Sequence, residues 1–137
     1  MPTREFIPTS EWEDIRQLRG LWGEQLAMAY LISCGWEVEA HRFRPGRHDI
    51  DLIVRRGKLV AFVEVKTRKA LTQGSGVEAV GGRKQSTIAK VASLWRLRYG
   101  RPDDEYRFDV VAVQDHGSGR STVEHVKDAW RLGRGWP

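Results

Sequence analysis

Residues 48–66 read HDIDLIVRRGKLVAFVEVK, which is two apolar runs joined by a short polar turn. This pattern predicts a β-hairpin. Asp49 and Asp51 open the first strand, and Glu64 and Lys66 end the second. Charges are rare inside runs this apolar because desolvating an unpaired charge costs several kcal/mol. These four residues, the hairpin charges, therefore need a partner.

The pairing of the two strands decides whether the hairpin charges meet. With a two-residue loop at 56–57, Asp49 lies opposite Glu64. Asp51 then lies opposite Phe62. Cross-strand partners project from the same face and side chains alternate along each strand, so all four hairpin charges share one face. A slip of one residue would move the second pair of charges to the other face.

The hairpin charges match the ligand set of a hard divalent cation. Mg²⁺ prefers carboxylate and water oxygens, with few protein ligands and with substrate phosphates completing its shell. Such a cation lowers the pKa of a bound water and stabilises charge on a phosphoryl group. We therefore predict Asp51 and Glu64 as metal ligands and Lys66 as the group that orients the attacking water. The alternative is a structural salt-bridge cluster at a strand end.

Asp51, Glu64 and Lys66 follow the pattern D-x₁₂-E-x-K, which resembles the signature of PD-(D/E)XK nucleases. Together with other motifs, it resembles the YraN-like family of small bacterial endonuclease-like proteins, which is similar to archaeal Holliday-junction resolvases. The resemblance covers residues 19–132. The other residues that carry it are Arg19-Gly20, Gly23-Glu24, Ala27, Tyr30-Leu31, Gly35, Leu52-Ile53, Phe62-Val63, Val65, Thr67-Arg68, Val80, Lys84-Gln85, Arg107 to Val113 and Glu124-His125-Val126.

The resemblance implies a restriction-endonuclease-like fold, an α/β three-layer sandwich whose central mixed sheet is flanked by helices in the core order αβββαβ. It also implies a Mg²⁺-dependent endonuclease, a hydrolase that cuts DNA phosphodiester bonds and accepts Mn²⁺ as a substitute. Similarity to the resolvases adds branched or structured DNA as a substrate class. Glu24, on the first helix, is implied to be catalytic and to reach the metal, with Asp49 as an extra ligand.

The residues expected to contact nucleic acid are Arg19, Arg68, Lys84, Gln85 and His48. The resemblance implies that Lys84 and Gln85 open the second helix beside the site. His48 is expected to contact the substrate because of its basic neighbours. The chain departs from the family pattern in two places. The family usually reads Gly-Glu-Ile-Asp where residues 48–51 are His-Asp-Ile-Asp, and Gly81-Gly82 stand where a stiffer lead into the second helix is usual.

The chain has 137 residues and a net charge of +5, from 23 Lys and Arg against 18 Asp and Glu. This length suits one domain, which we place at 10–132, between an irregular leader at 1–9 and a short tail at 133–137. The basic balance favours a polyanionic partner such as DNA. The sequence has neither an apolar run of the ~18 residues that span a membrane nor a secretory signal. With a single cysteine, Cys34, expected to be buried, we predict no membrane partner and a cytoplasmic location.

The strands of the hairpin are expected at 49–55 and 59–66. Before it, periodicity predicts a helix from a capping box at Ser10 to Gly35 and a strand near 36–40. After it, we expect a loop from Thr67 to Gly76, a helix at 83–98, strands at 107–113 and 121–126, and a short helix from about Asp128. Asp109 lies within the strand at 107–113, which is otherwise apolar. We expect it to have a structural partner, such as an arginine or backbone amides, and do not place it in the site.

Two alternatives to a nuclease remain open on the sequence alone. The first is a nucleic-acid-binding module that keeps the nuclease fold without catalysis. The second is an assembly adaptor whose acidic cluster is purely structural. One domain of this size holds one site, so symmetric cutting of two strands would require a homodimer.

Overall fold

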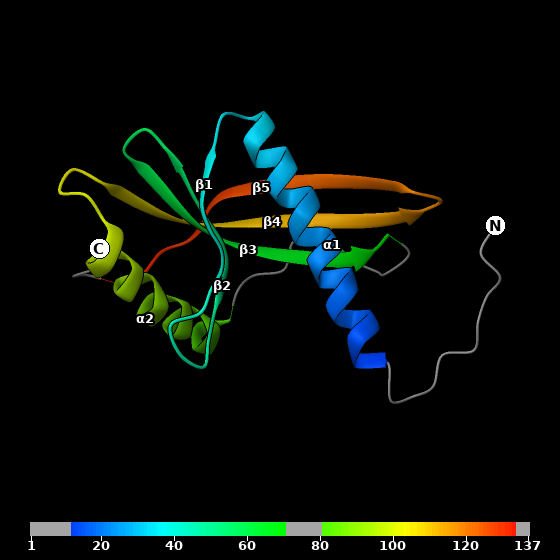
Figure 1. Ribbon diagram of the computed structural model, residues 1–137, viewed down its shortest axis with the longest axis horizontal. Helices are drawn as coiled ribbons and strands as arrows, with labels where there is room; N and C mark the ends of the chain where they lie inside the picture. Colours follow the sequence, from blue (N-terminus) through cyan, green and yellow to red (C-terminus); the bar gives the residue numbers. More distant parts are fainter. Residues whose placement is uncertain (1–11, 71–80, 134–137) are drawn as a thin grey trace.

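The structure is a computed structural model that describes residues 12–70 and 81–133, with side chains from residue 18 onward. The capping box expected at Ser10, most of the loop expected at 67–76 and most of the tail lie outside these residues. The elements along the chain (Figure 1) are α1 (Trp12–Ser33), β1 (Glu37–Phe43), β2 (Ile50–Arg56), β3 (Leu59–Lys69), α2 (Gly82–Tyr99), β4 (Glu105–Gly117) and β5 (Arg120–Trp130).

The five strands form one sheet in the order β1-β2-β3-β4-β5. Neighbouring strands are antiparallel except β3 and β4, which are parallel and have α2 between them in the sequence. One core cluster lies beneath α1 and the other beneath α2, on opposite faces of the sheet (Figure 1). The predicted α/β three-layer sandwich is therefore confirmed, and β5 is the trailing strand.

Both faces of β3 are covered, which explains its continuous apolar sequence. Phe62 belongs to the core beneath α2, where its ring lies edge-on to Trp95. Val63, the next residue, belongs to the core beneath α1. Since side chains alternate along a strand, Glu64 and Lys66 lie on the same face of β3 as Phe62, the α2 face.

The β2–β3 turn lies one residue later than predicted, at Gly57-Lys58. Gly57 has a φ of +63°, a conformation that glycine adopts without strain in the first position of a tight hairpin turn. The predicted pairing was therefore wrong by two residues, and Asp51 rather than Asp49 is level with Glu64. Because side chains alternate with a period of two, this shift leaves the charges on the same face.

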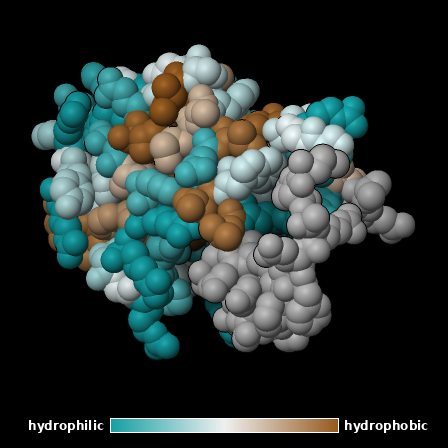
Figure 2. Space-filling view, turned by 45° about the vertical axis from the view of Figure 1, so that its right-hand side comes forward, coloured by the Kyte–Doolittle hydropathy of each residue, from teal (hydrophilic) through white to brown (hydrophobic). Residues whose placement is uncertain are grey.

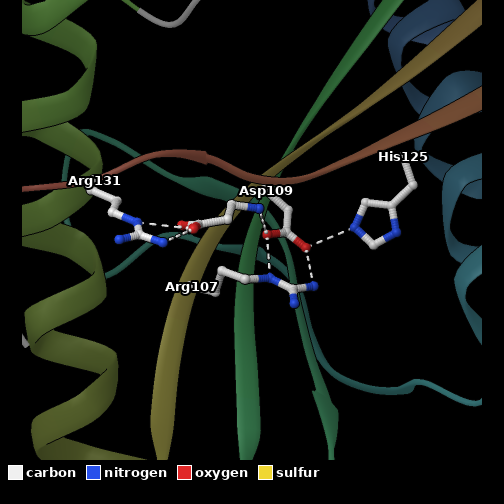
Figure 3. Close-up of polar contacts among 5 residues, drawn as sticks. Arg107, Asp109, His125 and Arg131 are labelled. Carbon is white, nitrogen blue, oxygen red and sulfur yellow. Dashed lines mark hydrogen bonds and ion pairs between the residues drawn. The ribbon is translucent and has the colours of Figure 1, made fainter.

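Asp109 in β4 is fully buried and organises the end of β5. Its carboxylate accepts two hydrogen bonds from Arg107, both of 2.8 Å, and one of 2.7 Å from His125 Nε2 (Figure 3). It also accepts the backbone N–H of Asp128 at 2.9 Å. The prediction that Asp109 has a structural partner, such as an arginine or backbone amides, is confirmed by Arg107 and the Asp128 amide.

The end of the described chain differs from the prediction of a short helix. β5 continues to Trp130, and Asp128 lies within it with a φ of +54°. The β4–β5 register shifts between Phe108 and Val110, opposite this segment. A backbone held by the buried Asp109 carboxylate, rather than by a regular ladder, explains why the segment is an irregular strand.

The end of α1 shows a second difference. Gly35 has the left-handed φ of +93° expected after a helix end, so this part of the prediction is confirmed. Cys34 is exposed, however, and the expectation of a buried thiol was wrong. The residue lies past the last helical residue, where the chain turns away from the core.

Large apolar side chains are exposed on both helices. They are Leu18, Tyr30 and Ile32 on α1 and Leu94, Leu97 and Tyr99 on α2. Figure 2 shows one side of the molecule, on which apolar residues lie in separate patches among polar ones. Within the described residues, neither helix combines the length and apolar composition needed to cross a bilayer.

Gly23 fixes the distance between α1 and β3. A Cβ atom at this position would lie 1.9 Å from Thr67 Oγ1 and 3.0 Å from Thr67 Cβ. Gly23→Ala should therefore lower the free energy of unfolding by about 1–3 kcal/mol, because the helix must move away from the sheet. Chemical denaturation of both proteins measures the difference.

Gly20 provides the matched control, because a Cβ atom there would meet nothing within 4 Å. Gly20→Ala should stabilise the helix by up to about 1 kcal/mol, the usual gain for alanine over glycine inside a helix. Thr67→Ala should relieve the loss caused by Gly23→Ala. Equal effects of the two glycine substitutions would contradict a close contact at Gly23.

Candidate functional site

Asp51 and Glu64 meet where β2 leaves β3. The ladder of the two strands ends at the pair Leu52–Val63. Beyond it, Asp51 Oδ2 accepts the backbone N–H of Val65 at 2.8 Å, in place of a ladder bond. This contact holds the Asp51 carboxylate beside β3, and the two carboxyl groups interact.

Glu64 stands apart from the other buried charges of the described residues. The other buried charged residues are Glu24, Arg55 and Asp109. Arg55 is paired with Asp104 and Glu39, Asp109 with Arg107 and His125, and Glu24 with Arg42. Glu64 Oε1 is buried without a hydrogen-bond partner. Its neighbour Asp51 is also an acceptor and can donate to it only when protonated.

The pKa values of both carboxyl groups reflect this arrangement. Burial, followed by the negative charge of Asp51, raises the pKa of Glu64 to about 8, against the opposing charge of Lys84. Burial also raises the pKa of Asp51, although the hydrogen bond from Val65 opposes the change. The carboxyl group of Glu64 therefore retains its proton at neutral pH in the absence of a cation.

Lys84 contacts this pair, and Lys66 lies on the same face of the sheet. Lys84, in the first turn of α2, places its Nζ atom 3.4 Å from Glu64 Oε2 and keeps about half of its side chain exposed. Lys66 is half-buried on the same face of β3 as Glu64. The hairpin charges Asp51, Glu64 and Lys66 thus share one face, as predicted.

Glu24 lies close to the pair but is bound elsewhere. Its charge helps to raise the pKa of Asp51. Its Oε1 atom accepts Arg42 Nε at 3.1 Å, and its Oε2 atom accepts Arg42 Nη2 at 2.8 Å. His41 Nε2 lies 3.2 Å from the same Oε1 atom. Asp49 is exposed before β2, and its charge also acts on Asp51.

The donor set fits a hard cation that has few protein ligands. No group of three or more His, Cys, Asp or Glu side chains in the described ranges, 12–70 and 81–133, is arranged to hold a metal. Asp51 and Glu64 supply two carboxylates, one with a buried oxygen that lacks a partner. Mg²⁺ commonly takes one or two carboxylates and completes its shell with water and substrate phosphates.

The residues expected to contact nucleic acid lie on different elements of the fold. Arg68 is half-buried on β3, two residues after Lys66 and therefore on the same face. β3 extends to Lys69, so the expectation of a loop beginning at residue 67 was wrong. Gln85 is half-buried in the first turn of α2. Arg19 is exposed on α1, more than one turn before Glu24.

His48 is exposed in the segment before β2 and lines a shallow pocket of about 210 Å³ between that segment and α2. Arg47 and Lys90 line the same pocket. Its lining residues include no acid. The charged groups that line the pocket are therefore basic.

The contacts of His41 and Arg42 with Glu24 carry no signal in the sequence. Both residues follow the strand predicted near 36–40 and belong to no motif. Arg42 also has a φ of +55°, which residues other than glycine, asparagine and aspartate rarely adopt. Only the three-dimensional arrangement brings them to α1.

The chain is similar to the members of one protein family. The model of the uncharacterised protein family UPF0102 matches residues 23–113. A UPF0102 protein of Rhodococcus jostii is 40% identical over 81% of this chain and 94% of its own length. A UPF0102 protein of Geobacter sulfurreducens is 35% identical over 92% of this chain and 98% of its own length.

The family match includes Glu24, Asp51, Glu64, Lys66 and Lys84. The alignments extend over most of both chains, so the similarity concerns the whole fold and not one motif. The resemblance inferred from the sequence motifs is confirmed at this level. The chain belongs to UPF0102, the YraN-like family.

Proposed function

We propose that this chain is a Mg²⁺-dependent endonuclease that hydrolyses phosphodiester bonds of DNA. One observation carries the proposal: the buried Glu64 Oε1 atom has no partner and lies beside a second carboxyl group, Asp51. A purely structural cluster would satisfy this oxygen, as the clusters at Arg55 and Asp109 do.

The residues of the pair have distinct roles in this proposal. Asp51 and Glu64 would hold the cation, and Asp51 remains anchored by the Val65 amide. When bound, Mg²⁺ would supply a water of lowered pKa and positive charge for the phosphoryl oxygens. Lys66 would orient the attacking water and stabilise the charge that develops on the phosphoryl group. Glu24 would support the cation or its hydration shell.

The charged surroundings favour a polyanionic substrate. Lys84 is half-exposed next to Glu64, and Gln85 follows it in the same helical turn. Arg47, His48 and Lys90 line the pocket between the segment before β2 and α2. These side chains could contact phosphates on either side of the bond to be cut, as could Arg68. The net charge of +5 agrees with this preference.

The resemblance to Holliday-junction resolvases makes branched or structured DNA the first substrate to test. One chain provides one site, so paired cuts on two strands would require two copies of the chain. A homodimer on such a substrate is part of the proposal.

A nucleic-acid-binding module without catalysis is the second candidate. It is favoured by the contacts of Glu24, which is held by Arg42 and His41 and leaves the pair without a third carboxylate ligand among the described residues. Such a module would bind DNA at the same basic surface. It would not cut DNA with any divalent cation.

Lys66→Ala distinguishes these candidates. The wild-type protein should nick supercoiled plasmid or a synthetic four-way junction with Mg²⁺ or Mn²⁺, and a chelator should stop the reaction. Lys66→Ala should reduce the single-turnover rate by about 10²-fold or more, because a group that acts on the proton or charge of the reacting centre is lost. Circular dichroism should show an unchanged fold.

Lys69→Ala is the matched control, since it removes the same charge from an exposed position of β3. It should retain most of the activity. A wild-type protein that binds DNA but never cuts it with either cation would support the second candidate. An assembly adaptor would show little salt-dependent affinity for DNA.

A further inference from the structure

Arg42 occupies the position on β1 that is level with the candidate metal ligands. In the β1–β2 ladder, His41 pairs with Leu52 and Phe43 pairs with Ile50. Arg42 therefore stands opposite Asp51, which is in turn level with Glu64 on β3. These three residues form a row across three neighbouring strands.

The side chain of Arg42 does not follow the alternation of a regular strand. Consecutive residues of a strand point to opposite faces, yet His41 and Arg42 both contact Glu24. The φ of +55° at Arg42 explains the exception, because it turns the side chain out of the regular pattern. Such a conformation is unfavourable for an arginine and persists only when other contacts hold it.

The contact that holds this conformation is a bidentate ion pair with a buried carboxylate. Glu24 is 6% exposed, and both of its oxygens accept hydrogen bonds from Arg42. Bidentate pairs of this kind are strong and directional. Arg42 itself remains about half exposed and also feels the charges of Asp49 and Asp51. It is thus within the field of three carboxylates.

We propose that Arg42 is a switch residue that couples cation binding to phosphate binding. In the structure its guanidinium engages both carboxylate oxygens of Glu24. When a divalent cation binds the pair, Glu24 turns to the ion or to its water shell. Arg42 then relaxes to the regular strand conformation, faces the Asp51 side of the sheet and binds a phosphate oxygen of the DNA. This inference rests on the proposed function.

The coupling follows from differential contacts in the two states. Before the cation binds, Arg42 Nε and Nη2 are hydrogen-bonded to the two oxygens of Glu24. Afterwards Glu24 serves the cation and Arg42 serves the phosphate, so each ligand favours the state that the other requires. By linkage, DNA must raise cation affinity by the same factor by which the cation raises DNA affinity.

Mn²⁺ titration of the protein without DNA, followed by calorimetry, tests the first half of this switch. Arg42→Ala should bind Mn²⁺ at least about fivefold more tightly than the wild type, because Glu24 is released in advance. Arg42→Lys keeps the positive charge but loses the bidentate contact, and it should also gain affinity. A gain in Arg42→Ala alone would reflect simple removal of positive charge and would overturn the switch.

A double substitution tests whether the gain acts through Glu24. In a Glu24→Gln background, Arg42→Ala should no longer raise Mn²⁺ affinity, since the released carboxylate is absent. The matched control is Arg44→Ala, which removes an exposed guanidinium that donates to the Gly46 carbonyl. Arg44→Ala should leave Mn²⁺ affinity unchanged. Thermal unfolding should be recorded for every variant, and Arg42→Lys serves if Arg42→Ala does not fold.

DNA affinity measured with and without Ca²⁺ tests the second half of this switch, in which Arg42 binds a phosphate. The cation should strengthen DNA binding in the wild type, and this strengthening should fall at least about fivefold in Arg42→Ala. A wild type that nicks DNA while Arg42→Ala and Arg42→Lys keep its Mn²⁺ affinity would overturn the switch and leave the proposed function intact. A wild type that neither binds Mn²⁺ nor cuts DNA would overturn both.

Discussion

Glu64→Gln is expected to abolish metal-dependent cleavage and, at the same time, to stabilise the fold at alkaline pH. The substitution removes one of two carboxylates proposed to hold the cation, so cleavage should fall to the background level. The same change replaces a buried carboxyl group by an amide that can donate to Asp51. At alkaline pH, where both wild-type carboxylates are acceptors only, their contact thereby becomes a hydrogen bond.

The sign of the stability effect follows from the raised pKa of Glu64, about 8 in the folded protein against an ordinary value of 4.5. Protonated Glu64 contributes stability that is fully present below about pH 4.5 and is lost as the pH rises through about 8. Glutamine does not titrate, so the variant should not show this loss. At pH 9 we expect it to be about 1–3 kcal/mol more stable than the wild type, the usual cost of an unsatisfied buried group.

Chemical denaturation at pH 5 and pH 9, with and without Mg²⁺, measures this effect. Mg²⁺ should stabilise the wild type and not the variant, because only the wild type retains both proposed ligands. Glu124→Gln removes the same charge from an exposed position of β5 and should alter neither stability nor cleavage. A Glu64→Gln protein that is less stable than the wild type at pH 9 would show that Glu64 is a structural residue.

The hairpin shows why the site could be predicted from the sequence although the register could not. The turn chemistry allowed loops at either 56–57 or 57–58, and a sequence with glycine at the shared position does not choose between them. The two pairings differ by two residues, which is one full period of the strand. The face that carries Asp51, Glu64 and Lys66 was therefore the same in both.

Features that depend on distant contacts were not predictable in this way. The segment at Asp128 was expected to form a helix, and it is a strand because a buried carboxylate on β4 binds its backbone. The conformation of Arg42 likewise depends on Glu24, 18 residues earlier in the chain. Local propensity has no access to such partners, so tertiary contacts decide these elements.

Asp109→Ala is expected to have the largest effect on stability. Asp109 is fully buried and accepts hydrogen bonds from Arg107, His125 and the Asp128 amide. Removing its carboxylate leaves Arg107 without its charge partner, in a position where only 18% of its side chain is exposed. Breaking a buried pair by removing one partner costs about 3–5 kcal/mol. Domains of this kind have a total stability of about 5–15 kcal/mol, so much of the protein should unfold near 37 °C.

The pH dependence identifies this loss as electrostatic. Burial raises the pKa of Asp109, but the hydrogen bonds from His125, Arg107 and Asp128 outweigh it, so the pKa lies below the ordinary 3.8. The ionised carboxylate therefore contributes stability that is present above about pH 4 and is lost as the pH falls below that value. Asp109→Asn keeps the shape of the side chain and should lose less stability than Asp109→Ala, with a weaker dependence on acid.

Asp103→Ala, at an exposed position before β4, is the matched control and should change the free energy of unfolding by less than about 0.5 kcal/mol. Because Asp109 lies outside the Asp51–Glu64 pair, its variants should keep the wild-type cleavage rate per folded molecule at low temperature. If Asp109→Asn kept the wild-type free energy of unfolding but lost cleavage, the Asp109 cluster would have to be part of the catalytic machinery. If Asp109→Ala were as stable as the wild type, the buried ion pair would contribute specificity of structure and not stability.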